Sequence, residues 1–350
     1  MDVWIKLIAK KLGLSRSTRL VFLLALLGAA PLGFQGCSSM SVPGTSYSGP
    51  LPPVTPGETQ LSANLRRHVQ SLAGDIGERN RVRPQAYQRA EDYISEAFRL
   101  AGYAPKLLQP RSLEGVTIHN IEAEITGTNQ TGEILVLGAH YDSEKDCPGA
   151  NDNGSGIAAL LELARLCAGQ PTARTVRFVA FYDEEYFGDR PMGSRLYARY
   201  CRLQHDNIVG MFSLETIGYY SDAPHSQHYP LLFHAFHPGY SRTGNFVAFI
   251  GNTHSRELVD QAVASFRAHS NFPSEGLVAP WYVGDAGRSD HGSFWKEGYP
   301  GLMVTDTAEF RYDYYHEAED TPDKLDYDRM ARVTSGLAQV VRDLANWRTP

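Results

Sequence analysis

The sequence predicts an α/β fold in which a mixed, mostly parallel central sheet is covered by helices on both faces. Short apolar runs alternate along the chain with segments of helical periodicity. The apolar runs are continuous, which is typical of strands buried on both faces of a sheet. The 350 residues, 42% of them hydrophobic and 21% charged, are enough for one large globular core. After the N-terminal region, no shift in composition marks a second domain.

The elements can be assigned in chain order. Pro84 opens the first helix, 84–101, whose apolar residues recur on one face and which ends before Gly102. We expect strands at 116–125, 133–137, 176–182, 208–214 and 302–304, and further helices at 154–168, 192–201 and 326–347. Residues 219–250 indicate only a long loop with one or two strands. In such folds, long loops lie near the carboxyl ends of the strands, where ligands bind.

The N-terminal region predicts export. Basic residues precede an uncharged run from 20 to 36, as in a secretory signal, and Gly36-Cys37 resembles a bacterial lipoprotein box. We expect residues 1–36 to be a lipoprotein-type signal peptide, 37–57 a flexible linker rich in Ser, Pro and Gly, and 58–350 the functional domain. The protein would lie in the bacterial cell envelope, periplasmic or facing the outer membrane, and would touch the membrane only through a lipid on Cys37.

Charge and cysteine content exclude several classes of function. Without residues 1–36 the chain has 28 basic and 38 acidic residues, a net charge of −10. A chain with this negative charge lacks the excess of basic residues that is typical of proteins that bind nucleic acid. The charge also argues against direct binding to anionic lipid. The three cysteines of the domain are too few for a disulfide scaffold. They leave at least one free thiol or an intermolecular pair, and the pairing of Cys147, Cys167 and Cys201 stays open.

Acidic and histidine side chains follow four predicted strands, and a fifth group precedes the last helix. The groups are His140 with Asp142, residues 149–156 around Asp152, Asp183-Glu184-Glu185, Glu215, and residues 315–323 around His316. A histidine at a strand end can offer a ring nitrogen to a metal while a nearby carboxylate fixes its tautomer. Adjacent carboxylates after an apolar strand are costly unless a cation or a proton shares them. Each group alone also fits a core histidine, a helix cap or a surface loop.

Together and in this order, the groups resemble the co-catalytic dizinc aminopeptidase family, which also contains glutamate carboxypeptidase and the glutaminyl cyclases. The resemblance covers roughly residues 60–347. Its motifs are His140-Tyr141-Asp142-Ser143, Asn151-Asp152-Asn153-Gly154-Ser155-Gly156, Asp183-Glu184-Glu185, Ser213-Leu214-Glu215, Ser289-Asp290-His291, and Tyr315-His316 followed by Glu319-Asp320-Thr321. It implies the zinc exopeptidase fold, of the phosphorylase/hydrolase-like type, two Zn²⁺ ions as cofactors and a peptide substrate.

The resemblance also implies a role for each site residue. Five residues would bind metal: His140 and Glu215 one zinc, Glu185 and His316 the other, and Asp152 both. Asp142 would orient His140, and Glu184 would be the general base that activates a metal-bridging water. Family members often have a cis peptide bond after the bridging aspartate, here Asp152–Asn153. Several members have Asp at the position of Glu215, which leaves the metal geometry and preference open.

The charges of this set balance. Two Zn²⁺ ions bring +4, and Asp152, Glu185, Glu215 and a bridging hydroxide bring −4. Glu184 is then free of metal binding and available to move a proton.

The sequence thus predicts a zinc-dependent exopeptidase, first of all an aminopeptidase. A carboxypeptidase or dipeptidase on the same core would aim a cation such as Arg242, Arg288 or Arg311 at a substrate carboxylate. The same motifs also allow a single-zinc glutaminyl cyclase or a non-catalytic peptide-binding lipoprotein. The residue preference, the physiological substrate, the native metal and the oligomeric state stay open.

Two further sets of residues are candidates for lining the site. Ser289-Asp290-His291 is expected to be a structural or substrate-lining element beside the site, since no Gly-x-Ser-x-Gly motif accompanies it. Five aromatic residues are candidates for a side-chain pocket, although core packing is the more common role: Tyr141, Tyr219, Tyr220, Trp281 and Tyr282.

Overall fold

The computed structural model describes residues 42–346 except 187–190, 230–238 and 280–283. The expected signal peptide, Cys37, Trp281 and Tyr282 lie outside the described residues. The described residues belong to one unit. None of the helices within 42–346 that the structure describes is long and apolar enough to cross a lipid bilayer.

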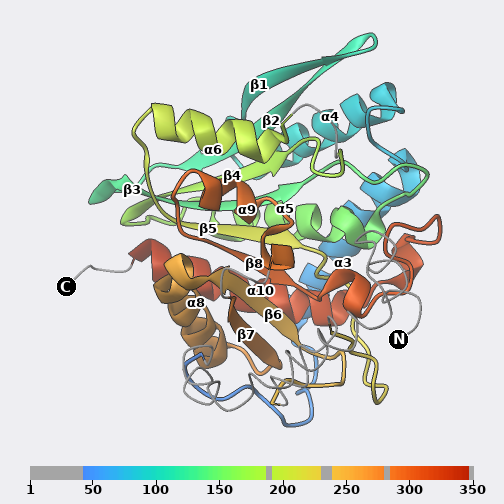
Figure 1. The fold of residues 1–350 in the computed structure, drawn as a ribbon, viewed down its shortest axis with the longest axis vertical. Coiled ribbons are helices and arrows are strands. Elements are labelled where there is room, and N and C mark those ends of the chain that lie inside the picture. Colours follow the sequence, from blue (N-terminus) through green and yellow to red (C-terminus); the bar gives the residue numbers. More distant parts are fainter. Residues whose placement is uncertain (1–41, 187–190, 230–238, 280–283, 347–350) are drawn as a thin grey trace, which may run out of the picture. The chain divides into compact units, whose positions relative to one another are not determined.

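A mixed sheet forms the centre of the domain (Figure 1). Its eight strands, all within the described residues, are β1 (Lys106–Leu113), β2 (Val116–Ile125), β3 (Gln130–His140), β4 (Arg174–Phe181), β5 (Asn207–Glu215), β6 (Val247–Asn252), β7 (Ser274–Ala279) and β8 (Gly301–Thr305). Their order is β1-β2-β4-β3-β5-β8-β6-β7. The central strands β4, β3, β5 and β8 are mutually parallel, whereas β2 and β6 pair antiparallel with this block. The prediction of a mixed, mostly parallel sheet is confirmed.

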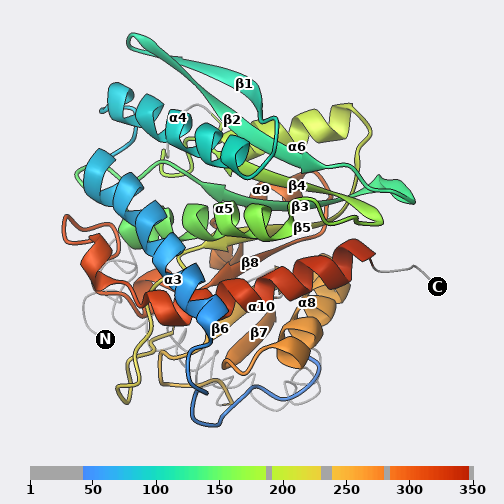
Figure 2. The same cartoon turned by 180° about the vertical axis from the view of Figure 1, so that it is seen from behind.

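Helices cover both faces of the sheet. One face carries α3 (Pro56–Val69), α4 (Pro84–Leu100), α5 (Gly156–Cys167), α8 (Arg256–His269) and α10 (Tyr327–Asn346), and the other carries α6 (Gly193–Leu203) and α9 (His291–Lys296). Figure 2 shows the first group in front of the sheet, and Figure 1 shows the second. The larger apolar core lies beneath the first group and a smaller one beneath α6 and α9.

The predicted elements are present with shifts of a few residues at their ends. The predicted helix 84–101 is α4, which begins at Pro84 and buries Ala90, Ile94 and Phe98. Within 219–250 the structure places the start of β6. Helix α3 is not among the predicted elements, although a capping box marks its start. Thr55 Oγ1 accepts from the backbone N–H of Glu58 (3.2 Å), and the Glu58 carboxylate accepts from that of Thr55 (2.8 Å).

Residues 42–55 have no regular secondary structure but lie against the domain. Val42 and Leu51 pack on the apolar core. Arg267 of α8 donates to two backbone carbonyls of this segment (2.7 and 2.9 Å), and Arg332 of α10 donates to a third (2.5 Å). The expectation of a flexible linker up to residue 57 therefore does not hold from residue 42 on. Buried or half-buried arginines satisfy the extended backbone there, and α3 already begins at Pro56.

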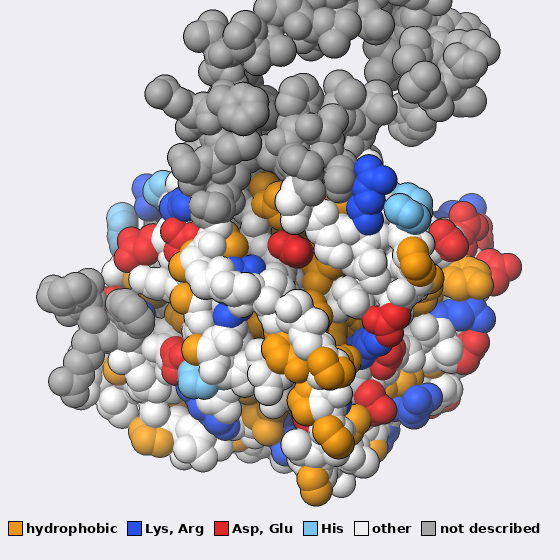
Figure 3. Space-filling model, turned by 90° about the horizontal axis from the view of Figure 1, so that it is seen from below, with side chains coloured by type: hydrophobic (Ala, Val, Ile, Leu, Met, Phe, Trp, Pro, Cys, Tyr) orange, Lys and Arg blue, Asp and Glu red, His pale blue; other side chains and the backbone are white. Residues whose placement is uncertain are grey.

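On the face of the molecule seen in Figure 3, acidic and basic side chains are mixed with apolar ones. This mixture agrees with the nearly balanced numbers of 33 basic and 39 acidic residues in the chain.

Three neighbouring parallel strands end at the same edge of the sheet. His140 is the last residue of β3, Glu184 and Glu185 follow the end of β4, and Glu215 is the last residue of β5. Because β4, β3 and β5 are adjacent and parallel, these side chains come together there.

Candidate metal centre

The five predicted metal ligands lie together at this edge. His140 Nε2 lies 3.3 Å from Asp152 Oδ1 and 3.3 Å from Glu215 Oε2. His316 Nε2 lies 3.1 Å from Asp152 Oδ2 and 3.2 Å from Glu185 Oε1. The two oxygens of Asp152 therefore face two different histidines, and each histidine has a second carboxylate beside it.

Four of these side chains are buried and His316 is half-buried, yet several of their polar atoms have no hydrogen-bond partner. His140 is 1% exposed and Asp152 is 2% exposed. Within the described residues, both Asp152 oxygens, Glu185 Oε1 and His316 Nε2 lack a partner. Buried polar atoms almost always have one, so a group of such atoms requires an explanation. Imidazole and carboxylate are the donors that zinc and similar divalent cations take, and the residues present fit such a group.

The charges of the cluster also favour a cation. Burial raises the pKa of Glu185 well above its ordinary value, and the charge of Asp152 adds to this. Burial raises the pKa of Glu184 as well; His140 opposes the shift, and Glu185 and Glu215 increase it. Carboxylates that repel one another in a buried site are stabilised by positive charge.

Asp142 connects three parts of the site. Its carboxylate oxygens accept from the backbone N–H groups of Glu184 (3.1 Å) and Glu185 (3.0 Å), and Oδ1 lies 3.4 Å from His140 Nδ1. The residue expected to orient His140 thus also fixes the loop after β4. A single carboxylate sets the position of the expected base relative to an expected ligand.

The first residue of the acidic triplet points away from the cluster. Asp183 has a positive φ of 57°, and its carboxylate accepts two hydrogen bonds from Arg81 (3.0 and 2.7 Å). Its backbone N–H donates to Tyr87 Oη (2.8 Å). Asp183 therefore anchors the turn, which leaves Glu184 and Glu185 facing the site.

The loop that carries Asp152 is held by two residues whose roles the sequence analysis missed. The Asp320 oxygens accept from the backbone N–H groups of Asn151 (2.8 Å) and Asp152 (3.1 Å). Arg79, which is fully buried, donates to the carbonyls of Tyr141 and Gly149 at 2.8 Å each. Asp320 belonged to a recognised motif, whereas nothing in the sequence marked Arg79. The Asp152–Asn153 peptide bond is cis, as the resemblance implied.

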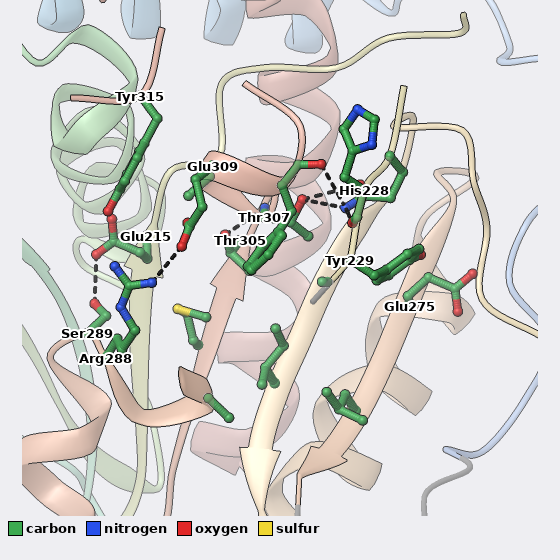
Figure 4. Close-up of a pocket in the computed structure, with 18 of the residues that line it drawn as sticks. Glu215, His228, Tyr229, Glu275, Arg288, Ser289, Thr305, Thr307, Glu309 and Tyr315 are labelled. Carbon is green, nitrogen blue, oxygen red and sulfur yellow. Dashed lines mark hydrogen bonds and ion pairs between the residues drawn. The ribbon is translucent and has the colours of Figure 1, made fainter. Parts of the chain in front are cut away.

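Ser289 supports Glu215. Its hydroxyl donates to Glu215 Oε2 (2.6 Å) and contacts the hydroxyl of Ser213 (3.0 Å), as Figure 4 shows for the first contact. His291 is fully buried, and its Nε2 lies 2.6 Å from the carbonyl oxygen of Ala286. The serine and the histidine therefore do not form a nucleophile–base pair, and the motif has a structural role beside the site.

Tyr315 points its hydroxyl towards Glu215 in Figure 4. Its ring stacks on His316, with centroids 3.9 Å apart and an interplanar angle of 18°. Burial raises the pKa of Tyr315, and the charges of Asp152 and Glu185 add to this. The hydroxyl therefore keeps its proton and is a hydrogen-bond donor at the cluster.

A cavity of about 160 Å³ extends from the cluster over β8, β6 and β7 (Figure 4). Glu215, Thr305, Ala248 and Glu275 are paired in register across four adjacent strands and so share one face of the sheet. The row spans three strand spacings, about 14 Å. Met303, Ile250 and Leu277 form a second row, and Tyr229, Tyr240, Phe246 and Phe310 line the walls. The cavity thus has a mostly apolar floor with a glutamate at each end of its first row, Glu215 at the cluster and Glu275 at the far end.

The other aromatic candidates that the structure describes pack inside the protein. Tyr141 is fully buried, and its hydroxyl donates to the carbonyl of His119 (2.9 Å). The half-buried Tyr219 ring lies tilted by 45° against Tyr312, with centroids 4.9 Å apart, and the Tyr220 hydroxyl donates to the carbonyl of Ile217 (2.9 Å). Their role is core packing.

The candidate cations and thiols have identifiable surroundings. Arg311 is buried and donates to Gln227 Oε1 (2.9 Å) and to the Phe246 carbonyl (2.8 Å), so it supports the fold. Arg288 pairs with Glu309 at 2.5 Å beside the cavity. Among the described residues, the cavity lining does not include Arg242. Among the described residues, the thiols of Cys147, Cys167 and Cys201 are free and buried.

Comparisons with known proteins are consistent with this site. The model of peptidase family M28 matches residues 120–341. The uncharacterized protein YfbL of Escherichia coli is 34% identical over 283 residues, 78% of this chain and 85% of YfbL. The probable aminopeptidase YDR415C of Saccharomyces cerevisiae is 28% identical over 245 residues, 65% of this chain and 58% of the yeast protein. The structure of BSAP, a zinc aminopeptidase from Bacillus subtilis, superposes with a TM-score of 0.64 at 15% identity, covering 81% of this chain and 95% of BSAP.

Proposed function

Because this chain belongs to peptidase family M28, we propose that it is a zinc-dependent exopeptidase, an aminopeptidase that releases N-terminal residues from peptides. The observation that carries the proposal is the position of Asp152, whose two oxygens face His140 and His316 separately. A carboxylate between two histidines, each with a further carboxylate, is the arrangement that a pair of metal ions needs.

Two zinc ions are the proposed cofactors. His140 and Glu215 would hold one, Glu185 and His316 the other, and Asp152 would bridge them. When bound, zinc ions lower the pKa of water to near neutrality and polarise a substrate carbonyl. Ser289 keeps Glu215 in place, and Asp142 keeps His140 in place.

Glu184 is the proposed general base. Its carboxylate lies within 4.8 Å of the ligand atoms of His140 and Glu185. The five proposed ligands and a bridging hydroxide balance the metal charge without Glu184, so its carboxylate would take a proton from the attacking water. The same carboxyl would return the proton to the departing amine. Tyr315 would donate its hydroxyl hydrogen to the carbonyl oxygen as that oxygen gains negative charge.

The cavity is the proposed site for the side chain of the N-terminal residue. It begins at Glu215 and is lined by apolar groups such as Ile250 and Met303. A pocket of this kind favours large apolar side chains over small ones, by about 1–3 kcal/mol for each methylene that it buries.

Metal analysis combined with a panel of substrates tests the proposal. Purified protein should contain two zinc ions per chain and should cleave aminoacyl amides with large apolar side chains. It should not cleave the same compounds after N-acetylation. Cleavage at the carboxyl end of N-blocked peptides, or a single zinc ion with cyclisation of N-terminal glutamine, would contradict the aminopeptidase assignment.

We also propose that the protein is exported and anchored by a lipid on Cys37. The basic N-terminus, the apolar run that follows and Gly36-Cys37 support this proposal. The variant Cys37→Ser should move from the membrane to the soluble fraction, and unchanged fractionation would contradict lipid attachment.

A further inference from the structure

A sixth carboxylate lies beside the half of the cluster formed by Glu185 and His316. An oxygen of Glu144 lies within 4.8 Å of the ligand atoms of both residues. Unlike the ligands His140 and Asp152, Glu144 is partly exposed. We propose that Glu144 binds the protonated N-terminal amine of the substrate, an inference that rests on the proposed aminopeptidase function.

The position of the cavity gives the direction of the amine. In an N-terminal residue, the amine, the side chain and the carbonyl carbon diverge from one Cα atom. Among the described residues, the cavity lining includes Glu184, Glu185 and Glu215 but neither His316 nor Glu144, so these two residues lie beyond the cavity on the far side of Glu185. With the side chain in the cavity and the carbonyl over Glu184, the amine therefore points to the half of the cluster that Glu144 borders.

Hydrogen bonds hold the segment that carries Glu144 in place before a ligand binds. Asn80 Nδ2 donates to the carbonyls of Ser143 (3.0 Å) and Glu144 (3.2 Å), and Glu78 Oε1 accepts from the backbone N–H of Asp146 (3.1 Å). The Glu144 carboxylate itself accepts from the backbone N–H of Lys145 (2.7 Å). A charged group that is already held in position loses little conformational entropy when it binds a ligand.

Charge explains why an ammonium ion would bind there. In the proposed core, two Zn²⁺ ions would be balanced by three carboxylates and a bridging hydroxide, so Glu144 would add a negative charge beyond that balance. Within the described residues, no Lys or Arg lies within ion-pair distance of Glu144. The ammonium of Lys145, its neighbour in the chain, lies 3.5 Å from Asp146. A protonated amine next to a partly buried carboxylate makes a charge-assisted hydrogen bond.

Kinetics on Glu144→Gln test the inference. KM for an aminoacyl amide should rise roughly 10- to 100-fold, which is the usual effect of losing a hydrogen bond to a charged group, while kcat changes little. The zinc content should not change, and Glu144→Asp should restore part of the affinity. Asp146→Asn is the matched control, because it removes an exposed charge from the same loop and should leave KM unchanged. An unchanged KM in Glu144→Gln would overturn the inference, and so would loss of zinc, which would make Glu144 a metal ligand.

A binding measurement separates this inference from the proposed function. Calorimetry with L-leucine and 4-methylpentanoate compares two ligands of the same carbon skeleton, only one of which has an amine. The zinc-loaded wild type should prefer leucine, and Glu144→Gln should lose that preference by a factor similar to its change in KM. If the wild type cleaves no amide at all, the proposed function fails while this measurement still tests Glu144. An equal preference for leucine in both proteins would overturn the inference.

Discussion

A comparison of two clusters of the described residues, each combining histidine with buried carboxylate, shows one difference between them. In the cluster between α3 and α5, Glu162 is 1% exposed and accepts from Asn64 (3.0 Å) and Arg165 (2.7 Å), and it lies 3.4 Å from His68. Burial opposes its ionisation, but these hydrogen bonds lower the pKa of Glu162 to about 2. In the metal cluster, both oxygens of Asp152 lack a hydrogen-bond partner among the described residues. Burial of charge thus does not identify a ligand site. The cluster around Asp152 is marked instead by several buried atoms without such a partner that each lie within 3.3 Å of another proposed ligand atom.

The largest expected difference between the two clusters is their response to removal of metal. A chelator should abolish activity and lower thermal stability, because binding at about 1,000 times Kd contributes about 4 kcal/mol. For a domain of this size this corresponds to a decrease in Tm on the order of 10 °C. Scanning calorimetry with and without chelator, followed by return of zinc, measures the effect. A Tm that does not respond to the chelator would contradict the assignment of the cluster around Asp152 as a metal site.

The variant Glu184→Gln should affect chemistry without affecting metal. Loss of a general base lowers kcat by about 100- to 10,000-fold, while zinc content and substrate affinity stay near those of the wild type. Steady-state kinetics and metal analysis on the same preparation provide the comparison. Full activity would exclude Glu184 as the base, and loss of zinc would show that it is a ligand.

The variant Ser289→Ala should weaken zinc binding without abolishing it. Without the hydroxyl, Glu215 loses a 2.6 Å hydrogen bond, and zinc affinity should fall roughly 10- to 100-fold. Competition with a chelator measures the change. Ser293→Ala is the matched control, since the hydroxyl of this buried serine contacts Ser194 at 3.0 Å in the same part of the chain. Equal zinc affinities in the two variants would show that Ser289 does not act through Glu215.

The variant Glu162→Gln should leave activity unchanged and lower stability by about 1–3 kcal/mol. The folded-state pKa of Glu162 is about 2, below its ordinary value of 4.5. Its contribution is therefore fully present above about pH 4.5 and is lost as the pH falls towards 2. Urea unfolding at pH 7 and pH 3 should show a smaller difference between variant and wild type at pH 3. A difference that grows towards low pH would contradict this sign.

The central strands and the five clustered side chains could be predicted from the sequence for a physical reason. Strands buried on both faces are continuously apolar, and their parallel ends bring His140, Glu185 and Glu215 to one edge. The supporting contacts of Arg79 and Ser289 depend on loops that meet only in the folded chain, so no local pattern reveals them. The capping box at Thr55 can be recognised in the sequence. Strand β7 and helix α9 are too short to show a clear hydrophobic periodicity.

The row from Glu215 to Glu275 has a practical consequence for redesign. The proposed metal ligand Glu215 occupies one end of the row, while Ala248 and Thr305 line the cavity from the neighbouring strands. An engineer could therefore shorten the cavity by enlarging Ala248 alone and retune the enzyme towards small N-terminal residues. The catalytic end of the row, two strands away, would stay as it is.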